Sequence, residues 1–116
     1  MDIQLEVIRN LICEYFIKLN IRLSKIILFG SMAKQETKDF SDYDFLIITE
    51  SNLKIRMKRY INSLIKKELA QILVKNGNYW GSDILIRSQK EIDKYLNKIN
   101  TVTRTALLEG TIIYEN

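Results

Sequence analysis

The sequence predicts an α/β (α+β) fold, in which a small mixed β-sheet is flanked by helices. Stretches with apolar residues at helical spacing alternate along the chain with short apolar runs, as expected of a sheet packed by helices. The 116 residues contain no Pro, no Gly/Ser-rich linker and no internal repeat, and this length is typical of one domain. We therefore expect residues 1–116 to form a single domain.

The first half of the chain predicts one helix and two strands. Apolar residues recur at helical spacing over residues 3–19, and the runs "KIILFG" at 25–30 and "DYDFLIITE" at 42–50 predict strands. About a dozen residues separate these strands, which is short for a parallel crossover, so we expect an antiparallel pair. A short helix with Ser31 at its N-cap is expected over 31–35. The expected apolar face of the first helix consists of Ile3, Val7, Ile8, Leu11, Ile12, Tyr15, Phe16 and Leu19.

The second half predicts helices around a third strand and a short final strand. Residues 53–76 form a long amphipathic pattern, which Gly77 would end. The run at 82–87 predicts a third strand, and residues 89–109 are expected to be helical, with a break near Asn100 as an option. Gly110 would end that helix before the final strand "TIIYE".

The composition excludes several kinds of chemistry. The chain has no His, which removes His acid–base catalysis, Ser–His triads and zinc–His sites. The single Cys13 cannot form an internal disulfide, in agreement with a reducing compartment. No apolar run approaches the length of a membrane span, and the N-terminus lacks a signal-peptide layout. We therefore expect a cytoplasmic protein with no membrane association.

The net charge of +4 is mild and favours an anionic small ligand such as a nucleotide over a nucleic-acid partner. The cations between residues 54 and 67 are interpreted as a solvated helix face, with a partner surface as the alternative.

Acidic residues stand where two predicted strands begin. Asp42 and Asp44 are two apart, so in a strand both carboxylates project from one face, and Asp83 opens the third strand in the same way. Like charges this close repel one another unless a cation lies between them, and carboxylates suit hard ions such as Mg²⁺ or Mn²⁺. If the two strands are neighbours, three carboxylates converge into a metal site. The alternative for Asp83 is an ordinary turn residue at a strand start.

The turn after the first strand has the features of a phosphate cradle. Gly30 allows close backbone approach to a ligand, and Ser31 opens a predicted helix whose free N–H groups can bind phosphate oxygens. Lys34, one turn further, is a candidate contact of the same anion, and the alternative is an ordinary solvated side chain. Arg87 is a candidate nucleotide contact or a surface charge. Tyr79 and Trp80 are candidates for stacking on a base or for packing.

Gly30-Ser31, followed after ten residues by Asp42-x-Asp44, resembles the signature of the DNA polymerase β-type nucleotidyltransferase superfamily. The short chain resembles the minimal (MNT) branch, and "ALLEGTIIYE" resembles the helix-Gly-strand ending of the family. The third strand acid of the family maps onto Asp83. One difference is that many relatives carry Arg where this chain has Lys34, so the charge is kept and the bidentate fork is lost.

The resemblance implies a Mg²⁺- or Mn²⁺-dependent transfer of a nucleotidyl group, AMP from ATP, to a hydroxyl. It assigns catalysis and metal binding to Asp42, Asp44 and Asp83, and nucleotide binding to Gly30, Ser31 and Lys34. Members of the minimal branch often stand beside a HEPN toxin, and members of that kind act as antitoxins that transfer AMP to a toxin Tyr. A HEPN toxin or a second copy of the chain is thus the expected protein partner. The alternatives are small-molecule nucleotidylation, as in aminoglycoside-modifying relatives, and a non-catalytic module that neutralises a partner by binding.

Overall fold

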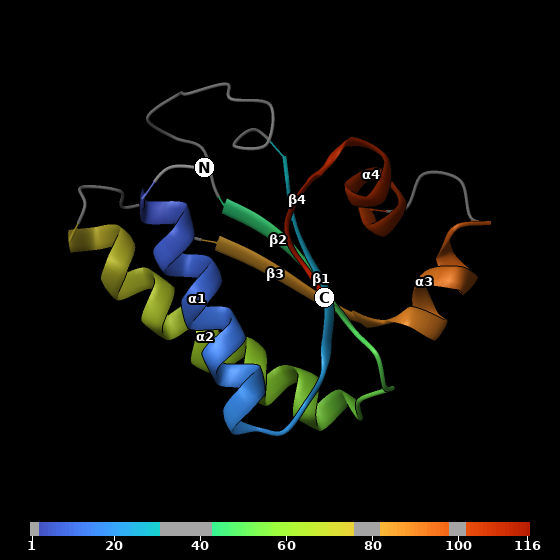
Figure 1. Cartoon of the computed structure of the whole chain (residues 1–116), viewed down its shortest axis with the longest axis horizontal. Helices are drawn as coiled ribbons and strands as arrows, with labels where there is room; N and C mark the ends of the chain where they lie inside the picture. Colours follow the sequence, from blue (N-terminus) through green and yellow to red (C-terminus); the bar gives the residue numbers. More distant parts are fainter. Residues whose placement is uncertain (1–2, 31–42, 76–81, 98–101) are drawn as a thin grey trace.

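The described residues form a four-stranded sheet with helices on both faces (Figure 1). The structure is a computed structural model, and it describes residues 3–30, 43–75, 82–97 and 102–116. In chain order the elements are α1 (Ile3–Lys18), β1 (Leu23–Phe29), β2 (Tyr43–Thr49), α2 (Ile55–Lys75), β3 (Ser82–Ser88), α3 (Gln89–Tyr95), α4 (Val102–Glu109) and β4 (Thr111–Glu115). The fold class predicted from the sequence is confirmed.

The sheet is mixed, with the strand order β3-β2-β1-β4. β1 pairs antiparallel with both β2 and β4, so the antiparallel pair expected from the short connection is confirmed. β2 and β3 are parallel and in register from Tyr43–Ser82 to Thr49–Ser88, because α2 provides the long crossover that a parallel pair requires. β3 and β4 are therefore the two edge strands.

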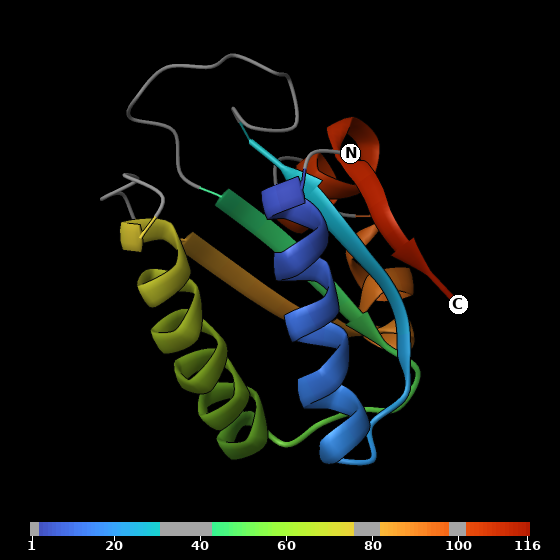
Figure 2. The same ribbon diagram turned by 60° about the vertical axis from the view of Figure 1, so that its left-hand side comes forward.

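Each face of the sheet carries its own apolar core. α1 and α2 lie side by side on one face (Figure 2) and bury residues from every strand there. A smaller cluster on the other face joins the sheet to α3 through Ile92 and to α4 through Ala106. Within the described residues, no helix is both long and apolar enough to span a lipid bilayer.

The apolar face expected for the first helix is wrong at two positions. Leu5, Ile8, Ile12 and Phe16 are the residues that α1 buries, whereas Ile3 is 80% and Val7 46% exposed. A helix turns about 100° per residue, which places Ile3 and Val7 on the side opposite this buried row. Helical spacing alone did not separate the two sides.

The C-terminal helical region consists of two helices. α3 ends at Tyr95 and α4 begins at Val102, which agrees with the option of a break near Asn100. The Gly110 N–H donates to the Ala106 carbonyl at 2.8 Å and closes α4, as expected of a Gly helix stop. The helix expected at 31–35 and the stop expected at Gly77 lie outside the described residues.

Candidate active site

Gly30 follows the last residue of β1 and adopts a left-handed conformation, with φ of +76°. The antiparallel register pairs Phe29 with Asp44, so the Asp44 side chain lies next to this turn. A Cβ built on Gly30 would overlap Oδ2 of Asp44. Only Gly therefore satisfies both requirements of this position, a positive φ and room for the neighbouring carboxylate.

Asp44 and Asp83 are paired residues on neighbouring strands. The parallel register of β2 and β3 sets Asp44 beside Asp83, and neighbouring strands lie only about 5 Å apart. Tyr43 and Phe45 point into the core under α1 and α2, and alternation along the strand therefore turns Asp44 toward the opposite face. The same alternation turns Asp83 toward that face, because Ile84 belongs to the core under α1 and α2.

The two carboxylates differ in their exposure to solvent. Asp44 is half-buried, whereas the Asp83 side chain is 70% exposed. Nζ of Lys66, from α2, lies 3.9 Å from Oδ1 of Asp83, and this exposed pair contributes little stability. Lys66 does place one positive charge beside Asp83. The spacing of residues within α2 does not identify Lys66, because its position depends on how α2 packs along the edge of the sheet.

Three of the six predicted site residues are described by the structure. Gly30, Asp44 and Asp83 are brought to the same end of the sheet, at the end of β1 and the starts of β2 and β3. The other three, Ser31, Lys34 and Asp42, lie outside the described residues, as do Tyr79 and Trp80. Arg87, a candidate nucleotide contact, lies four residues beyond Asp83 on β3, where its Nη1 donates to the Ile86 carbonyl at 3.0 Å.

The side chains that the structure brings together are of the chemical type that binds a hard divalent cation. Asp44 and Asp83 offer carboxylate oxygens on the same face, and Mg²⁺ is commonly bound in proteins through one or two carboxylates. The space beside Gly30, which a side chain would fill, holds the Asp44 carboxylate. Among the described residues, no cluster of three or more His, Cys, Asp or Glu side chains is present, so the described part of the site is a carboxylate pair.

Comparison with known proteins identifies related folds. A model of the family described as "Polymerase beta, Nucleotidyltransferase" matches residues 10–116. The crystal structure of a provisionally assigned nucleotidyltransferase from Sulfolobus solfataricus superposes with a TM-score of 0.59 at 17% identity, covering 97% of this chain and 78% of that chain.

A second solved structure, a mutant of the toxin–antitoxin complex MntA-HpeT, superposes with a TM-score of 0.52 at 16% identity, covering 93% of this chain and 72% of that chain. At these identities the structural likeness establishes the fold. No significant match was found among curated proteins.

Proposed function

The chain belongs to the polymerase β nucleotidyltransferase family, and from this premise we propose that it moves AMP from ATP to a hydroxyl group in a metal-dependent reaction. The observation that carries this proposal is the meeting of Gly30, Asp44 and Asp83 at one end of the sheet. In the proposal, residues 1–116 act as one nucleotidyltransferase domain in the cytoplasm, where ATP is available.

In the proposed site the carboxylates bind the metal, and the turn after β1 binds the phosphates. Asp44 and Asp83 would hold Mg²⁺ or Mn²⁺ together with Asp42, which the sequence pattern adds to the site. Such an ion, when bound, neutralises charge on the triphosphate and on the transferring phosphoryl group. Gly30 keeps the Asp44 carboxylate close to the turn, and Gly30, Ser31 and Lys34 are the proposed contacts of the nucleotide phosphates.

The proposed reaction exchanges one bond at phosphorus for another. The acceptor oxygen forms a bond to the α-phosphorus of ATP, the bond from that phosphorus to the α–β bridging oxygen breaks, and pyrophosphate leaves. Asp83 is the exposed acid of the pair, so its carboxylate is proposed to receive or position the proton of the acceptor hydroxyl. Most of the acceleration would come from positioning and charge neutralisation.

The acceptor is proposed to be a Tyr hydroxyl of a HEPN toxin, which makes this chain an antitoxin and a protein adenylyltransferase. The similarity of the fold to a chain of the toxin–antitoxin complex MntA-HpeT supports this partner. A second copy of the chain is the other protein partner considered, since a small domain can complete its acceptor site through a partner.

The test uses one carboxylate variant at each strand and a matched surface control. Asp44→Asn and Asp83→Asn keep the side-chain volume and remove the charge, while Asp93→Asn makes the same change on the exposed part of α3. Each protein is incubated with Mg²⁺, α-labelled ATP and a HEPN-domain protein as the acceptor, and labelled protein and pyrophosphate are measured. We expect a loss on the order of a hundredfold with the first two variants, comparable to the loss of other groups that stabilise transition-state charge, and unchanged transfer with Asp93→Asn.

Equal labelling with all four proteins, or with none, would reject the enzymatic proposal. If the HEPN protein stays unlabelled and an aminoglycoside becomes labelled, the reaction stands and the proposed acceptor is wrong. Toxin neutralisation that persists in Asp44→Asn without any labelling would establish the non-catalytic alternative.

A further inference from the structure

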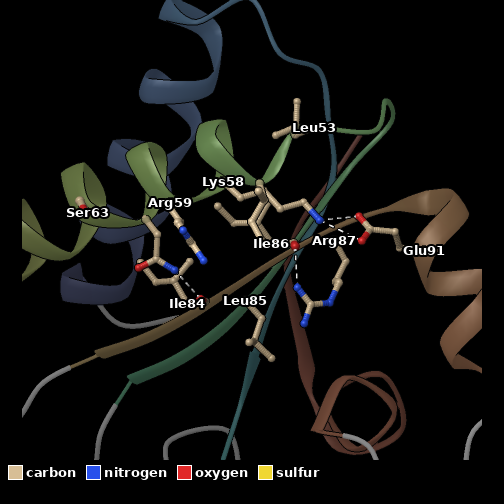
Figure 3. A pocket seen from close by; sticks show the side chains of 11 residues that line it. Leu53, Lys58, Arg59, Ser63, Ile84, Leu85, Ile86, Arg87 and Glu91 are labelled. Carbon is tan, nitrogen blue, oxygen red and sulfur yellow. Dashed lines mark hydrogen bonds and ion pairs between the residues drawn. The ribbon is translucent and has the colours of Figure 1, made fainter.

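A groove runs along the outer edge of β3, beside the candidate site (Figure 3). It lies between residues 55–63 of α2, residues 84–87 of β3 and Glu91 of α3, and it has a volume of about 870 Å³. We call it the β3 groove. Its lining includes apolar side chains and charged side chains, among them Arg59 from α2 and Arg87 from β3 (Figure 3).

One row of α2 side chains connects this groove with the carboxylate pair. Lys58, Asn62 and Lys66 are four residues apart and lie on the same side of the helix. Nζ of Lys58 donates to both carboxylate oxygens of Glu91, at 2.7 and 2.9 Å, and Nδ2 of Asn62 donates to the Ile84 carbonyl at 2.8 Å. Lys66 then lies beside Asp83. The groove therefore ends next to Asp83, one helical turn beyond Asn62.

The charged residues of the β3 groove are mostly cationic. Lys58, Arg59 and Arg87 line it with one acid, Glu91, and Lys58 already forms an ion pair with that acid. A smaller adjoining cavity shares Glu91 and adds Lys90 and Lys94 to the same surface. An anionic ligand is therefore favoured by the charge of this region.

The apolar part of the groove distinguishes between anionic ligands. Leu53, Ile55 and Leu85 contribute to the lining, and Ile55 is 65% exposed. A nucleic-acid backbone has no apolar group to cover these side chains, whereas an amphipathic protein segment has. The Ile84 and Ile86 carbonyls already accept from Asn62 and Arg87, so contact through side chains is favoured over the addition of another strand.

We propose that the β3 groove docks an acidic, amphipathic segment of the acceptor protein and so brings the acceptor hydroxyl to Asp83. Carboxylates of that segment pair with Arg59 and Arg87, and its apolar side chains cover Ile55. The identity of the docked protein as the acceptor rests on the proposed function. The binding of the segment to the groove does not rest on the proposed function, because it requires neither ATP nor a metal.

The binding test measures the fluorescence anisotropy of a labelled peptide of about twelve residues that alternates Glu with Leu, a length typical of groove-binding segments. A Lys/Leu peptide and a single-stranded oligonucleotide of the same length serve as the other probes. The variants are Arg59→Glu and Ile55→Asp in the groove. Arg56→Glu is the matched control, because Arg56 is exposed on the same turns of α2 and does not line the groove.

We expect the acidic peptide to bind the wild type and Arg56→Glu equally, and at least tenfold more weakly to Arg59→Glu and Ile55→Asp. Absence of peptide binding, equal weakening by both Arg substitutions, or tighter binding of the oligonucleotide would each overturn the proposal. All of these results are obtained without ATP, so they are independent of whether transfer occurs.

A kinetic measurement links the groove to the acceptor. With the HEPN protein as acceptor, Arg59→Glu should raise the KM for that protein about tenfold and leave the KM for ATP unchanged, while Arg56→Glu changes neither. An unchanged acceptor KM in Arg59→Glu would show that the acceptor does not dock in this groove.

Discussion

Gly30 and Asp44 occupy a single small volume at the end of β1. The carboxylate of Asp44 lies where a side chain at position 30 would begin, and the backbone of Gly30 has a positive φ. Two separate penalties therefore oppose any side chain at this position, steric overlap and backbone strain. The absence of a side chain at position 30 leaves room for the carboxylate in this place.

A double-mutant cycle separates these two penalties. Gly30→Ala should lower the free energy of unfolding by about 2–3 kcal/mol, of which about 1 kcal/mol is the left-handed backbone. In an Asp44→Ala background the overlap is absent, so the same substitution should cost only about 1 kcal/mol. Urea unfolding of the four proteins gives the coupling energy, and equal costs in both backgrounds would show that Asp44 does not occupy this space.

The contact between α1 and α2 includes a hydrogen bond as well as apolar side chains. The Tyr15 hydroxyl on α1 donates a hydrogen bond to Glu68 on α2. This bond, together with partial burial and the negative charge of Glu68, raises the pKa of Tyr15 from 10.0 to about 12. The bond requires the neutral phenol, so this contact between the two helices is lost when Tyr15 ionises at alkaline pH.

Removing this hydroxyl should produce a pH-dependent loss of stability. Because the pKa is raised in the folded state, the contribution is complete below pH 10 and declines as the pH rises toward 12. Tyr15→Phe should cost about 1–2 kcal/mol at pH 7, because a hydrogen bond to a charged group contributes about 1.5–3 kcal/mol and partial exposure reduces that value. Urea unfolding from pH 7 to 11 should show the difference between the two proteins shrinking above pH 10.

Tyr114→Phe is the matched control for this change, because Tyr114 lies on β4, outside the contact between α1 and α2. It should leave stability nearly unchanged across the same pH range. A constant difference between wild type and Tyr15→Phe up to pH 11 would contradict the assigned role of the hydrogen bond.

The molecule as a whole depends on β2, which contributes to the cores on both faces of the sheet. Phe45 and Ile47 enter the larger core, and Leu46 and Ile48 enter the smaller one. Asp44 and Asp83 are held in register only while this strand stays between β1 and β3. Stability and the geometry of the candidate site are therefore connected through one strand.

Truncation of a β2 core residue should destabilise the whole domain. Phe45 is fully buried, so Phe45→Ala should lower the free energy of unfolding by about 3–5 kcal/mol. Ile112→Ala on edge strand β4, where Ile112 is 48% exposed, should cost less than about 1 kcal/mol. Urea unfolding followed by circular dichroism compares them, and similar costs would contradict the central role of β2.

The sequence was sufficient for the individual strands because they are short apolar runs with clear ends. The apolar runs at 25–30, 42–50 and 82–87 correspond to β1, β2 and β3 within two residues, and the short β1–β2 connection correctly predicted an antiparallel pair. The pairing of Asp44 with Asp83 follows from the parallel register of β2 and β3. Alternation within each strand could predict which face each acid occupies. It could not predict that the two acids lie beside one another.

Features that depend on how helices cross the sheet were not predictable from local patterns. The contact of Lys66 with Asp83 and the β3 groove require the position of α2 along β3, which spacing within α2 does not contain. The exposure of Ile3 and Val7 depends in the same way on which side of α1 faces the sheet. Such properties arise from packing between distant segments.

The shared volume at Gly30 and Asp44 also has an evolutionary consequence. A Cβ at position 30 would force the carboxylate at position 44 out of its present place, so the two positions should vary together among homologous sequences. Lineages that replace Gly30 should also have lost the acid at position 44 and, with it, selection on the residue at position 83.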